Sequence, residues 1–127
     1  MAIFCDRILA GRDCTIFGDG GQTRDFVFVG DVARANLAAL ETDFVGPINI
    51  GTGLETDVNA LYAMLAKAAR TGRAAVHAEG KPGEQRRSCI DPARAAKILG
   101  WKPEVALEGG LERTFAFFAQ AAKGKKG

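Results

Sequence analysis

The sequence predicts an α/β protein in which several helices accompany a few short strands. Apolar residues at helical spacing alternate with short β-prone runs along the 127 residues. The composition, 47% hydrophobic and 25% charged, is that of a globular chain and excludes disorder over most of the length. A chain of this length buries roughly two thirds of its unfolded surface. We therefore expect one domain that needs no disulfide or metal, although its short strands make a thin sheet.

Helices are predicted where apolar residues recur every three or four positions between start and stop signals. Asp31 and either Thr56 or Asp57 are the expected N-caps, and Asp91 followed by Pro92 is a further start signal. The predicted helices cover residues 2–10, 32–40, 57 to near 72, 93–99 and 107–122.

Strands are predicted at short runs of β-branched and aromatic residues bounded by turn residues. The runs 15–17 and 26–29 flank a glycine-rich turn over 18–21 and are expected to form a strand, turn and strand unit. Two further short strands are expected at 48–50 and 74–78.

The charge balance argues against nucleic acid as a partner. The formal net charge is +2, and a C-terminal Lys/Gly tail holds Lys123, Lys125 and Lys126. Without these three the balance is 14 − 15 = −1, which leaves no basic stripe for counterion release.

No apolar run approaches the ~20 residues that cross a bilayer, and Asp6 and Arg7 interrupt the N-terminal apolar segment. We therefore expect a cytoplasmic protein that binds neither nucleic acid nor membrane.

The three cysteines, Cys5, Cys14 and Cys89, form an odd set without a C-x-x-C pair. Neither a disulfide framework nor a zinc site is predicted, and buried free thiols are expected. The single histidine, His77, has no second metal-binding residue type beside it, so no metal site is expected there either.

The sequence lacks the cofactor-binding loop and the catalytic residue pair of a complete dinucleotide-dependent enzyme. A dinucleotide-binding loop requires G-x-G-x-x-G, but Thr23 and Thr56 stand where the third glycine of the two glycine loops would fall. The lone Tyr62 is followed by a lysine at Lys67, five positions later instead of four, so no Tyr-x-x-x-Lys pair exists. His77 is interpreted as a packed strand residue in preference to a base. No catalytic residue is nominated.

Cations and one carboxylate gather in the predicted loops. Arg24 follows the glycine turn, and a second charged loop holds Lys81, Glu84, Arg86 and Arg87. Arginine binds phosphate through a planar fork and lysine as a point charge, while a carboxylate accepts paired hydroxyls such as those of ribose. These residues are either an anion site or solvated surface charge, and spacing alone favours the latter.

Several strings of the sequence together match one enzyme family. They are TIFGDGGQTRDFVFVGDVARA from Thr15, NIGTG from Asn49, PGE from Pro82 and ILGWKP from Ile98. In content, order and spacing they resemble NAD-dependent sugar-nucleotide epimerases and dehydratases of the extended short-chain dehydrogenase/reductase family, especially UDP-glucose 4-epimerases. The resemblance runs from about Ile3 to Phe118.

The resemblance is to the C-terminal part of that family, so a C-terminal fragment or truncated gene product is expected. It implies the C-terminal substrate-binding portion of an extended Rossmann-type fold over residues 1–122, with the main nucleotide-binding sheet missing, and a flexible tail over 123–127. In the family, the N-terminal Rossmann portion carries the NAD-binding fingerprint and the catalytic tyrosine and lysine. The resemblance therefore implies NAD in the parent enzyme and none bound by this chain alone, which we expect to be inactive without the N-terminal portion.

For single residues, the resemblance implies a substrate-binding set. The backbone of Thr15 and Phe17 would lie along the uracil ring of a UDP-sugar, although Phe17 is alternatively a core residue. Arg24 would grip the nucleotide diphosphate, and Glu84 would bond the uridine ribose. Lys81 departs from the arginine usual in the family, because it keeps the charge but loses the bidentate fork.

The favoured interpretation is the UDP-sugar-binding portion of an epimerase, which works with the missing N-terminal Rossmann portion. The alternatives are a stand-alone nucleotide-binding module, an interaction module that forms a homo-oligomer, and the same portion of a nucleotide-sugar dehydratase. An exposed apolar patch formed by Val27, Val29, Ile48 and Ile50 would mark missing sheet neighbours and would favour the epimerase portion or the interaction module.

Overall fold

A computed structural model of the chain describes residues 1–80, 82–83 and 85–126, without the side chains of 125 and 126. The chain divides into two compact units, each assembled from separate stretches. Unit 1 is Met1–Gln22, Asp57–Arg86 and Glu108–Gly127, and unit 2 is Thr23–Thr56 and Arg87–Leu107. The predicted α/β class with helices and short strands is confirmed. The predicted boundaries, 1–122 and a tail over 123–127, stay a prediction.

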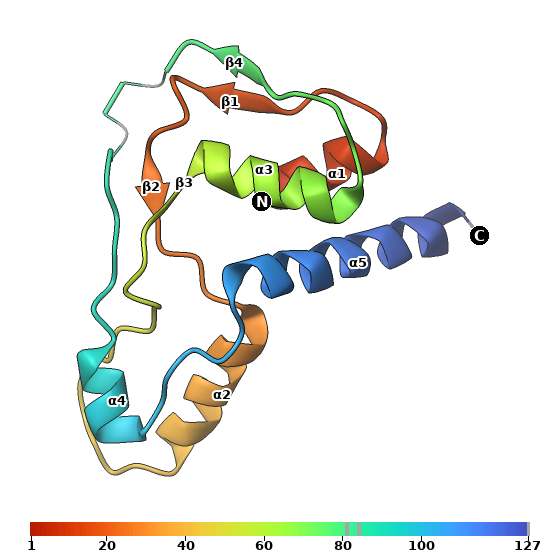
Figure 1. Ribbon diagram of the computed structural model, residues 1–127. Coiled ribbons are helices and arrows are strands. Elements are labelled where there is room, and N and C mark those ends of the chain that lie inside the picture. The colour runs from red at the N-terminus through yellow and green to blue at the C-terminus, as the bar shows by residue number, and fades with distance from the viewer. Residues whose placement is uncertain (81, 84, 127) are drawn as a thin grey trace. The chain divides into compact units, whose positions relative to one another are not determined.

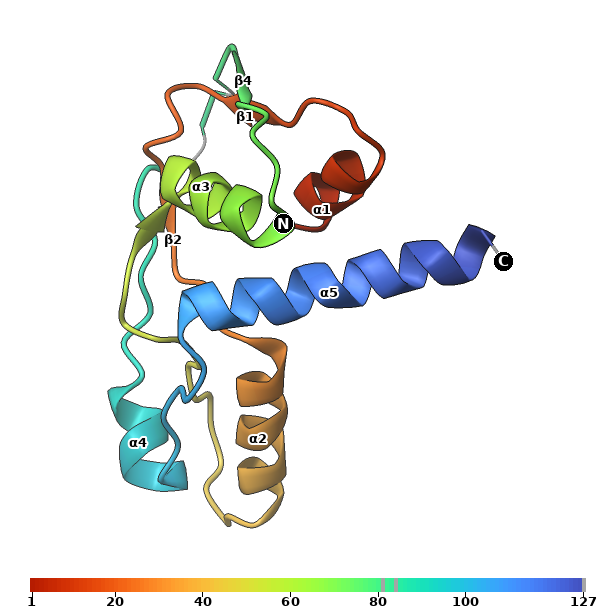
Figure 2. The ribbon, with the colours of Figure 1, turned by 45° about the vertical axis from the view of Figure 1, so that its right-hand side comes forward.

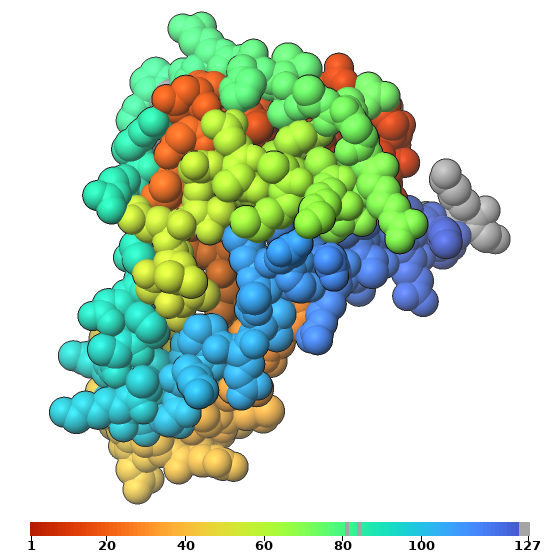
Figure 3. Space-filling model, in the orientation of Figure 1, coloured from red at the N-terminus to blue at the C-terminus, as the bar shows by residue number. Residues whose placement is uncertain are grey.

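Unit 1 combines a parallel strand pair with helices. Its elements are α1 (Ala2–Leu9), β1 (Thr15–Phe17), α3 (Val58–Ala69), β4 (Val76–Ala78) and nearly all of α5 (Leu107–Lys126). The partners in β1 and β4 are Thr15 with Val76, Ile16 with His77 and Phe17 with Ala78. In both ribbon views α1 and α3 lie on the same side of this strand pair (Figures 1 and 2). The space-filling view shows α3 and the segment leading to β4 as one continuous surface (Figure 3).

The core of unit 1 forms where the inward face of β1 meets α1 and α3. Cys14, Ile16 and Tyr62 are its buried centre, and Phe4 packs on it with its ring edge-to-face to Tyr62 at 5.7 Å. The Tyr62 hydroxyl donates to the Arg73 carbonyl, so the one polar atom of this ring is satisfied.

The ends of α3 follow the signals in the sequence. Asp57 is the N-cap, and its carboxylate accepts from the Ala60 amide at 2.6 Å. The helix ends at Arg70, which adopts the left-handed conformation at φ 56°, two residues before the predicted end near Gly72. The prediction of Thr56 or Asp57 as the cap is therefore confirmed.

Unit 2 pairs two helices over a small core. It contains α2 (Val29–Leu40) and α4 (Ala93–Leu99), which lie side by side in both ribbon views (Figures 1 and 2). The short strands β2 (Thr23–Arg24) and β3 (Thr56–Asp57) pair in a second two-stranded sheet. The buried centre of the core is Ala35, Ala95 and Trp101.

The start of α2 differs from the prediction. Helix α2 begins at Val29 with Phe28 as its N-cap, so Asp31 lies in the first turn and is not the cap. The prediction of a strand over 26–29 is also wrong. Phe28 keeps an extended backbone at φ −67° and ψ 139°, but its carbonyl accepts from Asp31 and Val32 within the first turn, and no ladder forms there in the described chain.

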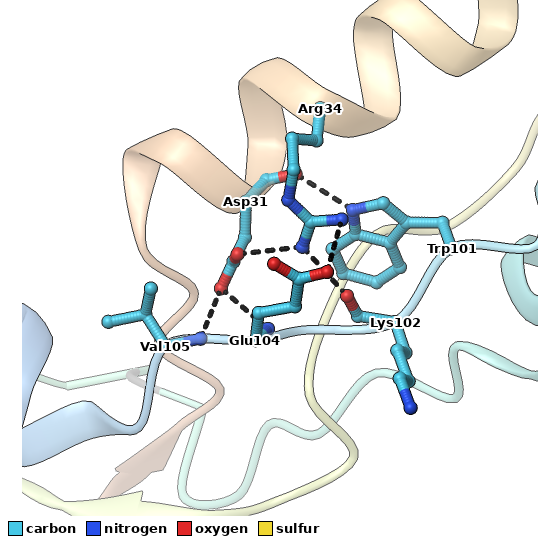
Figure 4. A network of polar contacts seen from close by, with 6 residues as sticks. All are labelled: Asp31, Arg34, Trp101, Lys102, Glu104 and Val105. Atoms are coloured by element: carbon cyan, nitrogen blue, oxygen red, sulfur yellow. Dashed lines mark hydrogen bonds and ion pairs between the residues drawn. The ribbon is translucent and has the colours of Figure 1, made fainter.

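The Asp31 carboxylate instead joins α2 to the chain beyond α4 (Figure 4). One oxygen accepts from Arg34 at 2.8 Å, and the other accepts from the amides of Glu104 at 3.2 Å and Val105 at 3.1 Å. The Trp101 indole donates to the Asp31 carbonyl at 2.8 Å. Asp31 is only 2% exposed, so a buried charge is fully engaged at this junction.

One further expectation for unit 2 is wrong, and a patch considered from the sequence is not formed. Residues 48–50 form no strand, because no neighbouring backbone pairs with them among the described residues, although the side chains of Ile48 and Ile50 pack on the core. The apolar patch that would mark missing sheet neighbours is not formed, since Val27, Ile48 and Ile50 are half-buried against Ala35, Ala95 and Trp101. Of the four patch residues Val29 alone is exposed, at 74%.

Two of the three cysteines and the start of the last helix agree with the sequence predictions. Cys5 and Cys14 are buried as predicted, but Cys89 is exposed. Helix α5 starts at the predicted Leu107 and continues to Lys126, beyond the predicted end at 122. No helix among the described residues is both long enough and apolar enough to span a membrane.

Candidate functional site

Strand β1 carries the first two predicted substrate-binding residues. Thr15 and Phe17 alternate with buried Ile16, so their side chains lie on the face opposite the core. Phe17 is 40% exposed and lies outside the buried centre of unit 1, and its carbonyl accepts from the Gln22 amide group at 3.2 Å. These residues thus present one strand edge and one half-exposed ring.

The turn after β1 is fixed by backbone geometry and one ion pair. Gly18 and Gly20 have φ values of 73° and 75°, and a Cβ on Gly20 would come within 2.1 Å of the Asn59 side chain. The Asp19 carboxylate accepts two hydrogen bonds from Arg86, at 2.7 and 2.9 Å. These bonds from Arg86, with one from the Gly21 amide, hold the pKa of Asp19 well below its usual range. Arg86, for which the sequence predicted no role, therefore stabilises the glycine turn.

Strand β2 carries Arg24, the third predicted substrate-binding residue. Its guanidinium donates to the Thr23 carbonyl at 2.6 Å, which holds the half-buried side chain against its own strand. The neighbouring Thr23 hydroxyl donates to Glu55 at 2.8 Å, and Arg87 donates twice to the same carboxylate, at 3.0 and 2.6 Å. Arg87 first and Thr23 second lower the pKa of Glu55 to about 2. Arg87, also unassigned from the sequence, is thus an ion-pair partner beside Arg24.

Asp25, the next residue, joins three stretches of unit 2. Its carboxylate accepts from the Thr52 hydroxyl at 2.6 Å, from the amides of Thr52 and Gly53 at 2.9 Å each, and from the Ile90 amide at 3.1 Å. Burial raises the pKa of Asp25, but these hydrogen bonds outweigh burial and leave the pKa below its ordinary value. A Cβ on Gly51 would lie 2.6 Å from the Ile90 side chain, so this close approach requires glycine. Asp25 therefore ties the chain next to Arg24 to the backbone at Thr52, Gly53 and Ile90.

The predicted residues fall in different parts of the chain. Thr15 and Phe17 share β1 in unit 1, and Arg24 belongs to β2 in unit 2. Lys81 and Glu84 lie outside the described residues, so their roles stay predictions. The sequence did not single out Asp25 or Glu55. Both carboxylates were missed because the groups that they bind lie 27 to 65 residues away in the sequence. The only local signal was the position of Asp25 between Arg24 and Phe26.

Residues with acid or base chemistry in unit 1 are engaged in structural contacts. Tyr62 is buried and bonded to the Arg73 carbonyl, and Lys67 pairs with Glu108 at 3.3 Å. Burial also raises the pKa of Tyr62, which makes its proton harder to remove. The His77 ring nitrogen contacts the Gly18 carbonyl at 3.0 Å. Among the described residues no three His, Cys, Asp or Glu side chains are grouped so that they could hold a metal ion.

The two glycine loops do not fit the pyrophosphate of a dinucleotide. A phosphate cradle needs backbone amides that point at the anion from the start of a helix. Here the amides of Thr52 and Gly53 donate to Asp25, and that of Gly21 donates to Asp19. The turn after β1 also leads into a strand and not into a helix. These described amides are thus engaged within the chain and do not form a phosphate cradle.

Unit 2 also has a groove with a volume of about 290 Å³. Its lining is mainly apolar and comes from Phe26, Thr52, Leu54, Thr56 and the segment 103–107. Thr15, Phe17 and Arg24, the predicted site residues that the structure describes, are not among the lining residues.

The comparison with known proteins decides the family. The family model of the GDP-mannose 4,6-dehydratases matches residues 2–114. The chain belongs to the NAD-dependent epimerase/dehydratase family. The matched part is the C-terminal part of this extended short-chain dehydrogenase/reductase family, as the sequence predicted.

Family members of similar sequence and structure include UDP-glucose 4-epimerases. The enzyme from Mycolicibacterium smegmatis is 42% identical over 119 residues, which cover 93% of this chain and 38% of the relative. The structure of the Thermotoga maritima enzyme with UDP-glucose has a TM-score of 0.91 and 41% identity, over 95% of this chain and 39% of the other. The Thermus thermophilus enzyme in complex with NAD has a TM-score of 0.83 and 35% identity, over 94% of this chain and 40% of the other. The chain thus spans about two fifths of each relative, and NAD is a cofactor of such relatives, as predicted for the parent enzyme.

Proposed function

We propose that this chain is the UDP-sugar-binding portion of an NAD-dependent sugar-nucleotide 4-epimerase and acts with an N-terminal Rossmann portion. The main support is the similarity to the Thermotoga maritima epimerase with UDP-glucose, which extends over 95% of this chain. In this proposal the N-terminal portion supplies the NAD site and the catalytic tyrosine and lysine. This division of roles between the two portions is consistent with two observations on the described residues. The Gly53 amide of one glycine loop is already engaged within the chain, and Tyr62 is buried.

Arg24 is the main diphosphate-binding residue in this proposal. A diphosphate is bound best by a planar guanidinium that makes paired hydrogen bonds. Arg24 is half-buried on β2 and tied to the Thr23 carbonyl, so little rotamer freedom remains to be lost on binding. Asp25 and Glu55 hold the surrounding backbone and side chains in place. Glu84 for the ribose, Lys81 for the diphosphate, and the backbone of Thr15 and Phe17 for the uracil complete the proposed set.

The test is a chimera in which this chain replaces the matched C-terminal part of the Mycolicibacterium smegmatis epimerase. With NAD and UDP-glucose, we expect the chimera to form the C4 epimer of the sugar nucleotide and the isolated chain to form none. We expect Arg24→Ala in the chimera to raise KM for UDP-glucose about a hundredfold, since a charge-assisted bidentate contact contributes roughly 2–3 kcal/mol. Arg94→Ala, which removes an exposed arginine of α4, is the matched control and should leave KM unchanged.

Two results would contradict the proposal. Epimerisation by the isolated chain would show that the N-terminal portion is not required. An unchanged KM for the Arg24→Ala chimera would remove Arg24 from the diphosphate site.

A further inference from the structure

Thr23, the residue before Arg24, is held on two sides. Its carbonyl oxygen accepts from the Arg24 guanidinium at 2.6 Å. Its hydroxyl donates to the Glu55 carboxylate at 2.8 Å and accepts from the Ser88 amide at 3.3 Å. Because a hydrogen bond to a carbonyl oxygen has a preferred direction, the orientation of the guanidinium depends on that of the Thr23 peptide. Two groups distant in sequence therefore fix the residue to which Arg24 is bonded.

Glu55 can hold Thr23 in place because its own carboxylate is fixed. The side chain of Glu55 is 23% exposed. Arg87 donates to both carboxylate oxygens, to Oε1 at 3.0 Å and to Oε2 at 2.6 Å, and Oε1 also accepts from the Thr23 hydroxyl. Glu55 directly precedes β3, the strand that pairs with β2. The carboxylate thus acts from a segment whose backbone is tied to the strand of Arg24.

The charge of Glu55 does not by itself suit a site for an anion. A carboxylate repels a diphosphate, and the bidentate pair with Arg87 offsets this repulsion. An electrostatic role and a positioning role therefore predict opposite effects of removing the acid. Loss of the negative charge alone would strengthen the binding of a diphosphate, whereas loss of the contact with Thr23 would weaken it.

We propose that Glu55 is a positioning residue for diphosphate binding, which holds the Arg24 guanidinium through Thr23 in the orientation that the diphosphate requires. This inference rests on the proposed function, because it takes as given that Arg24 binds the diphosphate. A guanidinium oriented in advance loses less rotamer freedom on binding, and its planar fork pairs with phosphate oxygens only in a narrow range of directions. Arg87 supports the same arrangement as the counter-charge that holds the Glu55 carboxylate.

The test measures the affinity of the chimera for UDP by isothermal titration calorimetry, which requires no turnover. We expect Glu55→Ala to weaken UDP binding about tenfold, a part of the loss expected when the guanidinium itself is removed. Glu55→Gln should bind UDP like the unaltered chimera, since its amide oxygen still accepts from the Thr23 hydroxyl. For Glu55→Ala the KM for UDP-glucose should rise by the same factor while kcat stays unchanged, because the contact orients a binding group and not the reacting atoms.

The Arg24→Ala background separates this role from a general loss of structure. If Glu55 acts through Arg24, Glu55→Ala should cause no further loss of UDP affinity once the guanidinium is absent. The matched control is Glu104→Ala, which removes another acid of unit 2 that pairs with an arginine, Arg34, at 3.4 Å. It should bind UDP like the unaltered chimera. Unchanged emission of the buried Trp101 verifies that unit 2 remains folded in each variant.

Three results would overturn the inference. They are an unchanged or higher UDP affinity of Glu55→Ala, an equal loss for Glu55→Ala in the presence and absence of Arg24, and equal losses for Glu55→Ala and Glu55→Gln, which would assign the effect to charge. None of them contradicts the proposed function, which is tested by the activity of the unaltered chimera and the effect of Arg24→Ala. A chimera that binds no UDP would contradict the proposed function and, with it, this inference.

Discussion

Replacing Asp31 by alanine should destabilise unit 2 strongly, because this carboxylate joins α2 to the segment beyond α4. The change removes the acceptor for Arg34 at 2.8 Å and for the amides of Glu104 at 3.2 Å and Val105 at 3.1 Å. Because Asp31 is 2% exposed, water does not replace these contacts while the fold remains closed.

The magnitude follows from the groups left without a partner. A buried donor that loses its acceptor costs about 1–3 kcal/mol. Two amides at the low end of this range, together with the bond from the 38% exposed Arg34, give a loss of about 3 kcal/mol for Asp31→Ala. A loss of that size should lower the urea midpoint of unit 2 by roughly 1–3 M.

The loss should depend on pH. Burial raises the pKa of Asp31, but hydrogen bonds from Arg34, Val105 and Glu104 outweigh burial, so the pKa in the folded chain lies below its ordinary value. A carboxyl whose pKa is depressed on folding stabilises the fold above its unfolded pKa of about 3.9 and loses this effect as the pH falls through the folded pKa. The difference between the unaltered chain and Asp31→Ala should therefore be full at pH 7 and shrink below about pH 4.

The fluorescence of Trp101 is the assay. It is the only tryptophan of the chain, it is 2% exposed and it belongs to the core of unit 2, so its emission reports on that unit. The control is Asp43→Ala, which removes an exposed carboxylate from the loop after α2 and should leave the midpoint unchanged. A loss below about 0.5 kcal/mol, the usual range of surface substitutions, would refute the reasoning. A loss that stays constant from pH 7 to pH 2 would refute the assignment to the ionised carboxylate.

Two further predictions concern unit 1 and the cysteines. Tyr62→Phe should cost about 1 kcal/mol, the net contribution of one buried hydrogen bond, measured by urea unfolding with far-UV circular dichroism. Because burial raises the pKa of Tyr62, the unaltered chain should also lose stability as the pH rises above about 10, and Tyr62→Phe should lose less over that range; equal losses would contradict this origin. In the folded chain a thiol-specific reagent should label Cys89 rapidly and the buried Cys5 and Cys14 only on unfolding; rapid labelling of more than one thiol would be inconsistent with the burial of these two residues.

The bounds of helices and strands were predicted correctly where residues next to both ends favour a start or a stop. Helix α4 covers the predicted 93–99, and Gly100 adopts the left-handed conformation at its end. Its N-cap is Pro92 and not the predicted Asp91, but the Asp91 carboxylate still accepts from the Ala93 amide at the helix start. Strand β1 likewise covers the predicted 15–17, since it is bounded by a turn with glycines at positive φ. In both cases the determining contacts lie within a few residues.

The errors arise where the determining contacts are distant in sequence. Asp31 has the residue type and position of an N-cap, but its carboxylate binds amides 73 and 74 residues later. The β-prone runs 26–29 and 48–50 have suitable side chains but no paired backbone among the described residues. Asp25 was missed for the same reason, because its partners at Thr52 and Ile90 are brought to it only by the fold.

The interleaving of the two units has a consequence for how the chain folds during synthesis. Unit 2 begins at Thr23 but needs the stretch Arg87–Leu107, which supplies α4 and Trp101, and unit 1 needs the stretch that starts at Glu108. Unit 2 can therefore not close until residues 87–107 have left the ribosome, and unit 1 not until the stretch from Glu108 has followed. The nascent chain must keep Thr23–Thr56 open while 30 residues of the other unit, Asp57–Arg86, pass through the exit tunnel. Closing contacts across such a long loop is slow compared with closing local contacts, so the nascent chain exposes its apolar residues longer than a chain of two successive domains would.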